Sequence, residues 1–322
     1  MSDAWKLDEL IHAGPEHLDP SFVAGYDRKQ GWPDPEPDLA VFEAYGAASV
    51  LDLGAGTGQF ALAAARRFRH VTAVDVSEVM VSELRERADA AGLSNLECVQ
   101  GGFLSYSSAA PVDGVYTRNA LHQIPDFWKG IALQRIAGML KPGCVLRLRD
   151  LIYDFTPAEA DSVFGAWFAG AAADPADGYT AADYAEHIRT EHSTYRWLLE
   201  PLLAATGFEI VSAEYLGRLY GAYTCVYRGT AGASLPGDRG RRHERPQRQR
   251  GDRGLDAVRH GRGAQPPGRQ HRQQQPGGGL RVGIGADAAV GLSLSAPDQV
   301  GQVRGDREDG AACWLAELRV GG

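Results

Sequence analysis

The chain has 322 residues, of which 44% are hydrophobic and 23% are charged, and its formal net charge is −8. This length suffices for one large α/β domain or two modest ones, and no apolar run approaches the ~20 residues of a membrane span. The first residues, MSDAWKLDELIHAG, contain acids where a secretory signal has a basic start and an apolar centre. We therefore expect a cytoplasmic protein that does not enter a membrane.

Charge and cysteine placement narrow the classes of partner. Residues 1–229 contain 18 Lys and Arg against 31 acids, whereas residues 230–322 contain 15 Arg, no Lys and 10 acids. An acidic body repels phosphate backbones, so we expect no nucleic-acid partner. The four cysteines are far apart and form no C-x-x-C pair, so neither a disulfide framework nor a bound metal is expected.

The first 45 residues predict a mostly helical segment that is interrupted by the proline-rich GWPDPEPD. Short apolar strands then alternate with amphipathic helices up to about residue 150. The strands are ASVLDL, VTAVDV, LECVQ, VDGVYT and CVLRLRD, and the helices are FALAAARRF, SEVMVSELRERADAAG and IALQRIAGML. Ser77 is expected to cap the second helix, and Lys141-Pro142-Gly143 to end the third. This alternation predicts a doubly wound, mostly parallel sheet with helices on both faces.

A second helical stretch is predicted over residues 157–206. FEIVSAEYL and AYTCVY follow as two strands with a short glycine-containing connection, which is typical of a hairpin. We therefore assign one α/β domain to residues 46–229, with residues 157–206 as a helical lid.

The composition changes at Gly229. Residues 230–322 contain 19 glycines, a single aromatic residue and a single isoleucine, and long stretches show no hydrophobic period. Such a segment buries too little apolar surface to offset its conformational entropy. We predict that residues 230–322 are a disordered tail rich in Arg, Gly and Gln.

The strongest motif is VLDLGAGTGQFA, residues 50–61, in which a strand runs into a glycine turn that opens a helix. Glycines there let backbone N–H groups approach a ligand closely. The spacing is G-x-G-x-G with Gln59 next, so the dinucleotide pattern G-x-G-x-x-G is not met. Asp52 would repel a pyrophosphate but favour a ligand that carries an ammonium and a sulfonium. These charges favour S-adenosylmethionine over NAD.

A second carboxylate, Asp75, ends the strand VTAVDV, 21 residues after Gly54. The ends of parallel strands meet at one edge of the sheet, where ligands of such folds bind. Asp75 could accept hydrogen bonds from both ribose hydroxyls there. A helix N-cap is the structural alternative for Asp75, but Ser77 is better placed for that role.

Taken together, VLDLGAGTG, VTAVDVS, VYTRNALHQIPD and LKPGCVLRLRD resemble the successive motifs of the class I S-adenosylmethionine-dependent methyltransferases. The resemblance covers roughly residues 20–228. It implies a Rossmann-like, seven-stranded sheet whose last strand, AYTCVY, is antiparallel. It also implies a methyltransferase that uses S-adenosylmethionine and acts on O, N, C or S of a small metabolite.

Site residues follow from the resemblance position by position. The loop that wraps the methionine portion corresponds to Gly54, Ala55, Gly56 and Gly58, and Asp52 to the acid near the cofactor's amino group. Asp75 corresponds to the ribose ligand, Val76 to the residue beside the adenine, Asn119 to a backbone contact with the carboxypropyl group, and Tyr26 to an aromatic residue closing over the cofactor.

The chain departs from the family pattern after its third strand. Many relatives have an aspartate there that accepts from the adenine amino group, but here the stretch is GGFLSY, so Gly102 or Phe103 occupies the place. Backbone groups or stacking would then have to supply the adenine contact.

On the acceptor side, His122 in RNALHQIPD is the candidate general base, because it follows the fourth strand and titrates near neutrality. A packed histidine in that turn is the alternative, and Asp150 and Tyr153 could also face the acceptor. His187 and His192 lie on a polar helix and are expected to be exposed to solvent. Phe164, Trp167 and Phe168 have helical spacing and are expected in the core.

Two other functions remain possible at this stage. A nucleotide-dependent oxidoreductase is disfavoured by Asp52 and Gln59, and a non-catalytic S-adenosylmethionine-binding protein by the presence of the residues on the sulfonium side. A nucleic-acid methyltransferase is disfavoured because TRNALH lacks the Pro-Pro-aromatic motif of enzymes that methylate flipped-out adenines.

We predict that the tail is dispensable for folding and for cofactor binding. A chain that ends at Thr230 should keep the melting temperature and the S-adenosylmethionine affinity of the full chain, because the last predicted strand is complete there. Thermal unfolding and titration calorimetry measure the two quantities. A drop of several degrees, or lost binding, would show that the tail packs on the domain.

Overall fold

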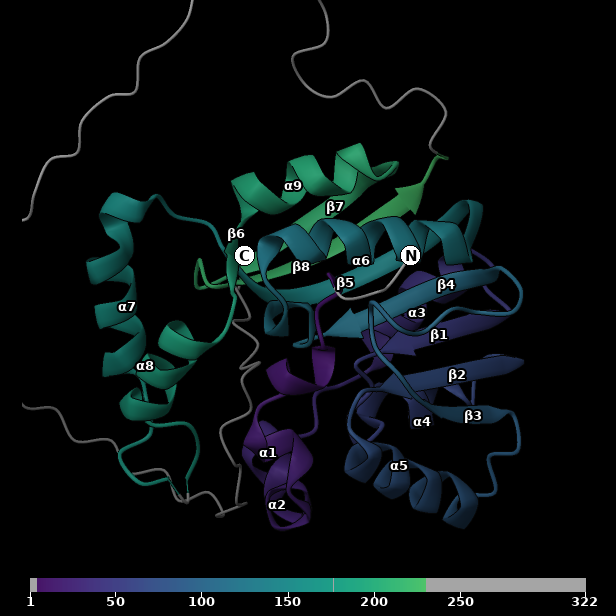
Figure 1. The fold of residues 1–322 in the computed structure, drawn as a ribbon, viewed down its shortest axis with the longest axis horizontal. Helices are drawn as coiled ribbons and strands as arrows, with labels where there is room; N and C mark the ends of the chain where they lie inside the picture. Colours follow the sequence, from purple (N-terminus) through teal and green to yellow (C-terminus); the bar gives the residue numbers. More distant parts are fainter. Residues whose placement is uncertain (1–4, 176, 230–322) are drawn as a thin grey trace, which may run out of the picture. The chain divides into compact units, whose positions relative to one another are not determined.

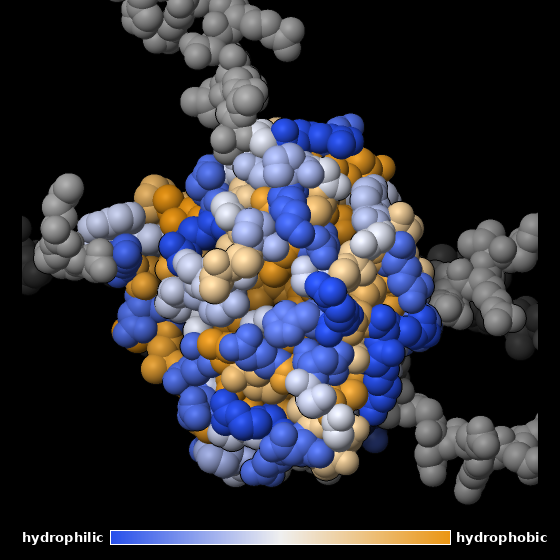
Figure 2. All heavy atoms as spheres, turned by 90° about the vertical axis from the view of Figure 1, so that its right-hand side faces the viewer, coloured by the Kyte–Doolittle hydropathy of each residue, from blue (hydrophilic) through white to orange (hydrophobic). Residues whose placement is uncertain are grey.

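The computed structural model describes residues 5–175 and 177–229. The disordered tail predicted for residues 230–322 lies outside the described residues. Within them, no helix is both long enough and apolar enough to cross a bilayer. On the face of the molecule that forms the right-hand side of Figure 1, hydrophilic side chains are interspersed with apolar ones (Figure 2).

One mixed sheet forms the centre of the fold, in the order β3-β2-β1-β4-β5-β8-β7 (Figure 1). The first five strands are parallel, β8 is antiparallel to both β5 and β7, and the short β6 pairs with β5 off this path. This confirms the predicted doubly wound, seven-stranded order and adds an eighth strand of two residues. The strands are β1 (Ser49–Leu53), β2 (His70–Asp75), β3 (Leu96–Gln100), β4 (Val112–Arg118), β5 (Leu140–Tyr153), β6 (Thr194–Tyr195), β7 (Phe208–Leu216) and β8 (Tyr220–Tyr227).

Helices cover both faces of the sheet (Figure 1). Leu133 of α6 and Leu199 of α9 belong to one buried cluster, and Phe42 of α3, Phe60 of α4 and Leu84 of α5 belong to another. The helices are η1 (Glu9–His12), α1 (Pro15–Leu18), α2 (Pro20–Gln30), α3 (Glu36–Ala44), α4 (Gln59–Ala64), α5 (Glu78–Ala90), η2 (Leu121–Gln123), α6 (Asp126–Met139), η3 (Pro157–Glu159), α7 (Ala160–Ala169), α8 (Ala181–Thr190) and α9 (Arg196–Ala205), where η marks a 3-10 helix.

Two local expectations have different outcomes. Ser77 caps α5 as predicted, because its side chain accepts from the backbone N–H of Met80. The predicted helix stop at residues 141–143 is instead part of β5, which follows α6 without a connecting loop. The register between β4 and β5 shifts there, and Gly143 has a φ of 90°. A proline cannot donate to the ladder, so this segment bulges from the strand rather than forming a separate turn.

The segment predicted as a lid, residues 157–206, divides into two parts. Helices α7 and α8 lie beside the sheet and contact each other (Figure 1). Helix α9 instead contacts α6 and β7, so it belongs to the layer that covers the sheet. The segment expected to form a lid is therefore not a single unit.

A buried ion cluster joins α3 to the face of the sheet. Asp38 is 1% exposed and accepts from Arg147 Nε at 2.8 Å, from Arg149 Nη1 at 2.9 Å and from the Tyr116 hydroxyl at 3.0 Å. Arg147 also donates to Thr224 Oγ1 at 3.0 Å. Each charged side chain of this cluster thus has a partner, because an unpaired charge is costly to bury.

We predict that Asp38→Ala lowers the free energy of unfolding by about 3–5 kcal/mol, because it leaves the buried Arg147 uncompensated. Glu43→Ala on the same helix is the control. Glu43 pairs with Arg67 at the surface, so its loss should cost less than about 1 kcal/mol. Denaturant titration compares the two variants. Equal stability would mean that Arg147 reaches water when its partner is removed.

Candidate active site

The glycine turn between β1 and α4 is fixed to the end of β2. The backbone N–H groups of Gly54 and Ala55 both donate to the carbonyl of Val74, at 2.8 and 3.0 Å. The N–H of Gly56 donates to Oδ2 of Asp75 at 2.8 Å. The turn therefore holds its shape through contacts of the protein alone.

Close packing explains two of the glycines. A Cβ on Gly54 would lie 2.3 Å from the Cβ of Ala120, and one on Gly58 would lie 2.0 Å from Cδ1 of Leu84. Both residues also have positive φ angles, 76° and 89°. Gly54 thus lets the turn approach the loop after β4, whereas Gly58 lets it pack on α5.

One buried and one half-buried carboxylate lie at this edge of the sheet. Asp52 is 2% exposed, and burial followed by the charge of Asp75 raises its pKa well above the usual value. Burial also raises the pKa of Asp75, although the N–H groups of Ser77 and Gly56 oppose this. In the described residues, neither carboxylate forms an ion pair with Lys or Arg. A ligand with positive charge would stabilise both ionised forms, and this fits the ammonium and sulfonium of S-adenosylmethionine.

A cleft over the glycine turn collects most of the predicted cofactor residues. Tyr26 lies over the turn, since its Cε1 is 3.8 Å from the place of a Cβ on Gly56. Asn119, directly after β4, has a left-handed φ of 49°. The predicted residues that line this cleft are Tyr26, Asp52, Gly54, Ala55, Gly56 and Asn119.

The N-terminal segment is held over this cleft by Asp27, which sequence reasoning missed. Oδ1 of Asp27 accepts from Thr57 Oγ1 at 2.5 Å and from Gln59 Nε2 at 3.1 Å, and Oδ2 pairs with Arg87 at 2.6 Å. Gln59 also donates to the carbonyl of Gly31 at 2.7 Å. Gln59, which breaks the dinucleotide pattern, is the sequence signal that could have pointed to this contact.

The predicted residues at the adenine end do not all lie together. Val76 lines a second cleft, next to Gly101 and Leu104. Gly102 packs against Val76 and Glu9. Phe103 belongs to the main core cluster and is 6% exposed, so its ring is not available for stacking on a ligand.

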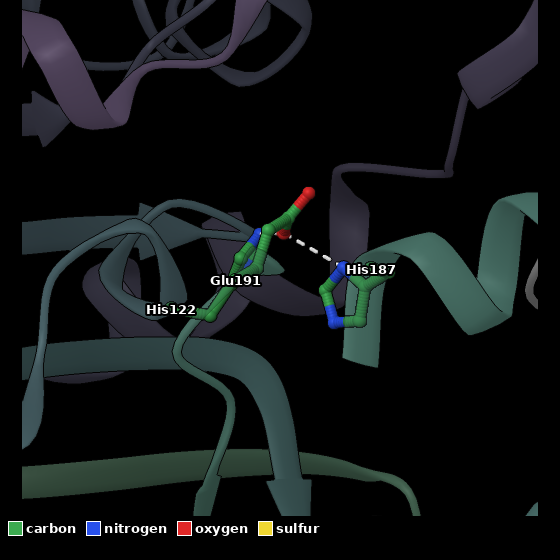
Figure 3. Close-up of side chains that lie close together, drawn as sticks. All are labelled: His122, His187 and Glu191. Carbon is green, nitrogen blue, oxygen red and sulfur yellow. Dashed lines mark ion pairs between the residues drawn. The ribbon is translucent and has the colours of Figure 1, made fainter. Parts of the chain in front are cut away.

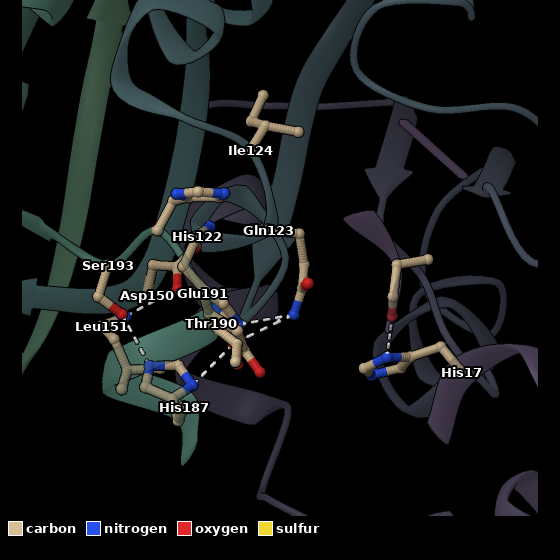
Figure 4. Close-up of polar contacts among 12 residues, drawn as sticks. His17, His122, Gln123, Ile124, Asp150, Leu151, His187, Thr190, Glu191 and Ser193 are labelled. Atoms are coloured by element: carbon tan, nitrogen blue, oxygen red, sulfur yellow. Dashed lines mark hydrogen bonds and ion pairs between the residues drawn. The ribbon is translucent and has the colours of Figure 1, made fainter. Parts of the chain in front are cut away.

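His122 is buried and held from both sides (Figure 4). Its Nδ1 contacts Oδ1 of Asp150 at 2.5 Å, and its backbone N–H donates to Oδ2 of the same carboxylate at 3.1 Å. Its Nε2 contacts Oε2 of Glu191 at 2.8 Å. Asp150, one of the alternatives on the acceptor side, therefore contacts His122. Tyr153 is buried in an aromatic cluster with Phe155.

His187 lies in the same group, so the prediction that it is exposed to solvent is wrong. Its Nδ1 contacts Oε2 of Glu191 at 2.7 Å (Figure 3), and its Nε2 contacts Ser193 Oγ at 2.8 Å. Only 15% of its side chain is exposed. The polar sequence of this helix predicts exposure to solvent, but α8 turns the face that carries His187 toward His122.

The three groups also have the spacing of a metal site. The nitrogens of His122 and His187 and the carboxylate of Glu191 lie within 4.8 Å of one another. Two imidazoles and a carboxylate are a ligand set that suits zinc or iron. No metal was expected from the sequence, and the residues come together only in the fold.

The charges around His122 shift its proton affinity. Burial lowers its pKa, but the charges and hydrogen bonds of Asp150 and Glu191 outweigh this and raise the pKa to about 10. Burial raises the pKa of Glu191, but His122 and His187 outweigh it and hold that pKa far below its usual range. In this arrangement His122 carries a proton at neutral pH.

A cavity of about 390 Å³ opens beside His122. It shares Tyr26, Gln30 and Asn119 with the cleft over the glycine turn, so the two spaces adjoin. Trp167, expected in the core, lines this cavity and stacks on Tyr184 with ring centroids 4.3 Å apart. The further aromatic residues along the wall are Tyr179 and Tyr220.

A sheet of this order, a glycine turn after β1 and an acidic residue at the end of β2 define a class I S-adenosylmethionine-dependent methyltransferase fold. Residues 50–143 match the family model of a methyltransferase domain. Residues 50–143 therefore contain a methyltransferase domain, as the sequence predicted, and this supports a methyltransferase over an oxidoreductase. A comparison with curated proteins found no match.

Solved structures with a similar fold include several methyltransferases. A SAM dependent methyltransferase from Aquifex aeolicus is 19% identical, with 65% of this chain and 99% of that chain covered and a TM-score of 0.44. Magnesium protoporphyrin IX methyltransferase from Synechocystis PCC 6803 with bound SAH is 15% identical, with 68% and 99% covered and a TM-score of 0.49. The CcbJ methyltransferase from Streptomyces caelestis is 20% identical, with 61% and 96% covered and a TM-score of 0.46.

We predict that Asp75 is required for cofactor affinity. Asp75→Ala should weaken binding of S-adenosylhomocysteine by about 1.5–3 kcal/mol, because it removes a charged acceptor and the anchor of the Gly56 N–H. Titration calorimetry measures this, and Glu97→Gln on the exposed part of β3 is the control. Unchanged affinity in Asp75→Ala would refute the assignment.

Proposed function

We propose that this methyltransferase acts on a small metabolite that binds in the cavity beside His122. The observation that supports this is the volume of about 390 Å³, which falls within the range of small-molecule pockets. The cavity is next to the cleft of the methyl donor, so it also favours catalysis over a non-catalytic binding role. A cytoplasmic location, expected from the sequence, stays a prediction.

The charge of the cavity limits the acceptor. Asp183, Glu186 and Glu191 line it, and the described lining residues include neither Lys nor Arg. A phosphorylated or otherwise anionic acceptor would meet the repulsion of three carboxylates, against which the protonated His122 is already paired with Asp150 and Glu191. The acceptor is therefore neutral or cationic, with an aromatic or apolar body that packs on Trp167 and Tyr184.

Alignment of the acceptor with the methyl donor is the main task of the site. S-adenosylmethionine supplies an electrophilic methyl group on a sulfonium. Tyr26 and Asn119 border both the cleft and the cavity, so they place the acceptor next to the donor. Proximity and orientation of this kind can contribute about 7–11 kcal/mol.

His122 is the group that removes the proton of an acceptor hydroxyl or amine. Asp150 fixes the ring and keeps Nδ1 as the hydrogen-bond donor, while Nε2 contacts Glu191, and both His122 and Glu191 line the cavity. The charges and hydrogen bonds of Asp150 and Glu191 keep the imidazole protonated. His122 can therefore act as a base only after its Nε2 has lost a proton. The acceptor atom is thus a protic oxygen or nitrogen.

We predict that His122→Ala lowers kcat by about 10²–10⁴-fold and leaves binding of S-adenosylhomocysteine nearly unchanged. Formation of S-adenosylhomocysteine with a panel of phenols, alcohols and amines identifies the acceptor and then measures kcat. His70→Ala, an exposed histidine on β2, is the control.

The pH profile is the second readout. A raised pKa of about 10 means that the deprotonated fraction of His122 grows with pH throughout the neutral range. The kcat of the wild-type enzyme should therefore rise from pH 6 to about pH 10, and this rise should be absent in His122→Ala. Full kcat in the variant would show that alignment alone suffices.

A further inference from the structure

Glu9, at the start of η1, has a buried carboxylate that is only half satisfied. Glu9 is 9% exposed, and Ser105 Oγ donates to its Oε2 at 3.1 Å. Its Oε1 has no hydrogen-bond partner among the described residues. Burial raises the pKa of Glu9, partly opposed by backbone N–H groups of residues 103–105. A buried acceptor without a donor costs free energy, so a ligand that supplied a donor to Oε1 would be stabilised here.

The carboxylate of Glu9 lies beside Gly102, one of the two positions at which many relatives have an aspartate after β3. A Cβ on Gly102 would lie 2.5 Å from Oε1 of Glu9 and 2.7 Å from its Cδ. This is close to the separation between Cβ and a carboxylate oxygen within one aspartate side chain. The carboxylate of Glu9 therefore occupies the space that an aspartate side chain at position 102 would fill.

The space next to Glu9 offers a hydrogen-bond acceptor and apolar side chains to a base. Glu9 lines the second cleft, of about 530 Å³, with Val76 and Leu104 as apolar walls. Val76, which lines this cleft, directly follows Asp75, the residue that corresponds to the ribose ligand, in the chain. The exocyclic amino group of an adenine is a donor that a carboxylate accepts.

We propose that Glu9 accepts a hydrogen bond from the amino group of the cofactor's adenine and so selects adenine over hypoxanthine. The residue that the loop after β3 lacks is thus supplied by the N-terminal segment, 93 positions before Gly102. This inference rests on S-adenosylmethionine as the methyl donor and is independent of the acceptor proposed above.

Titration calorimetry of the full chain with two ligands tests this. One ligand is S-adenosylhomocysteine, and the other is S-inosylhomocysteine, in which an oxygen replaces the amino group. The wild type should prefer the adenosyl ligand roughly 10- to 100-fold, because the inosyl oxygen would face a carboxylate. In Glu9→Gln the amide can also donate, so the preference should fall to nearly one. Glu97→Gln, on the exposed part of β3, should keep the wild-type preference.

Two outcomes would overturn the proposal. One is a wild-type preference that persists in Glu9→Gln, and the other is tighter S-adenosylhomocysteine binding by Glu9→Ala, which would show that the carboxylate blocks the subsite. Asp75→Asn separates this question from the identity of the donor, because it should weaken both ligands by the same factor. Glu9→Gln has the size of the native side chain, so it carries the test if Glu9→Ala does not fold.

Discussion

Three hydrogen bonds that backbone N–H groups of the glycine turn donate to the end of β2 determine the geometry of the site. Because the N–H groups of Gly54 and Ala55 share the carbonyl of Val74, the turn cannot move without β2. The N–H of Gly56 orients the carboxylate of Asp75 in the same way. The donor side of the active site is therefore organised before any ligand binds, and binding does not have to order this loop.

The N-terminal segment is part of this site rather than an addition to it. Asp27 joins α2 to Thr57 and Gln59 of the turn and to Arg87 of α5. Glu9 reaches the loop after β3 through Ser105. Two carboxylates of one segment thus contact the glycine turn and the loop after β3, so a ligand bound between these loops and order in this segment would stabilise each other.

The sequence predicts what depends on local periodicity and on contiguous motifs. β3 and β7 have the same bounds as the apolar patterns LECVQ and FEIVSAEYL. The glycine turn can likewise be predicted, because its residues form one contiguous motif. The contacts of His122 with Asp150 and Glu191 join segments that are far apart in the chain, and no period encodes them. The burial of His187 could not be predicted for the same reason. A polar helix face indicates exposure to solvent unless the residues that cover it are known.

Charge balance separates the two halves of the site. Asp52 is buried and Asp75 is half-buried, and neither has a Lys or Arg partner in the described chain, so a bound cation would stabilise their ionised forms. Around His122, in contrast, the two carboxylates are balanced by imidazole groups of the protein itself. A cationic ligand therefore belongs over the glycine turn, where it removes an electrostatic cost. In the proposed acceptor cavity the charges of the described residues already balance one another, so shape, aromatic packing and the proton affinity of His122 would select the occupant.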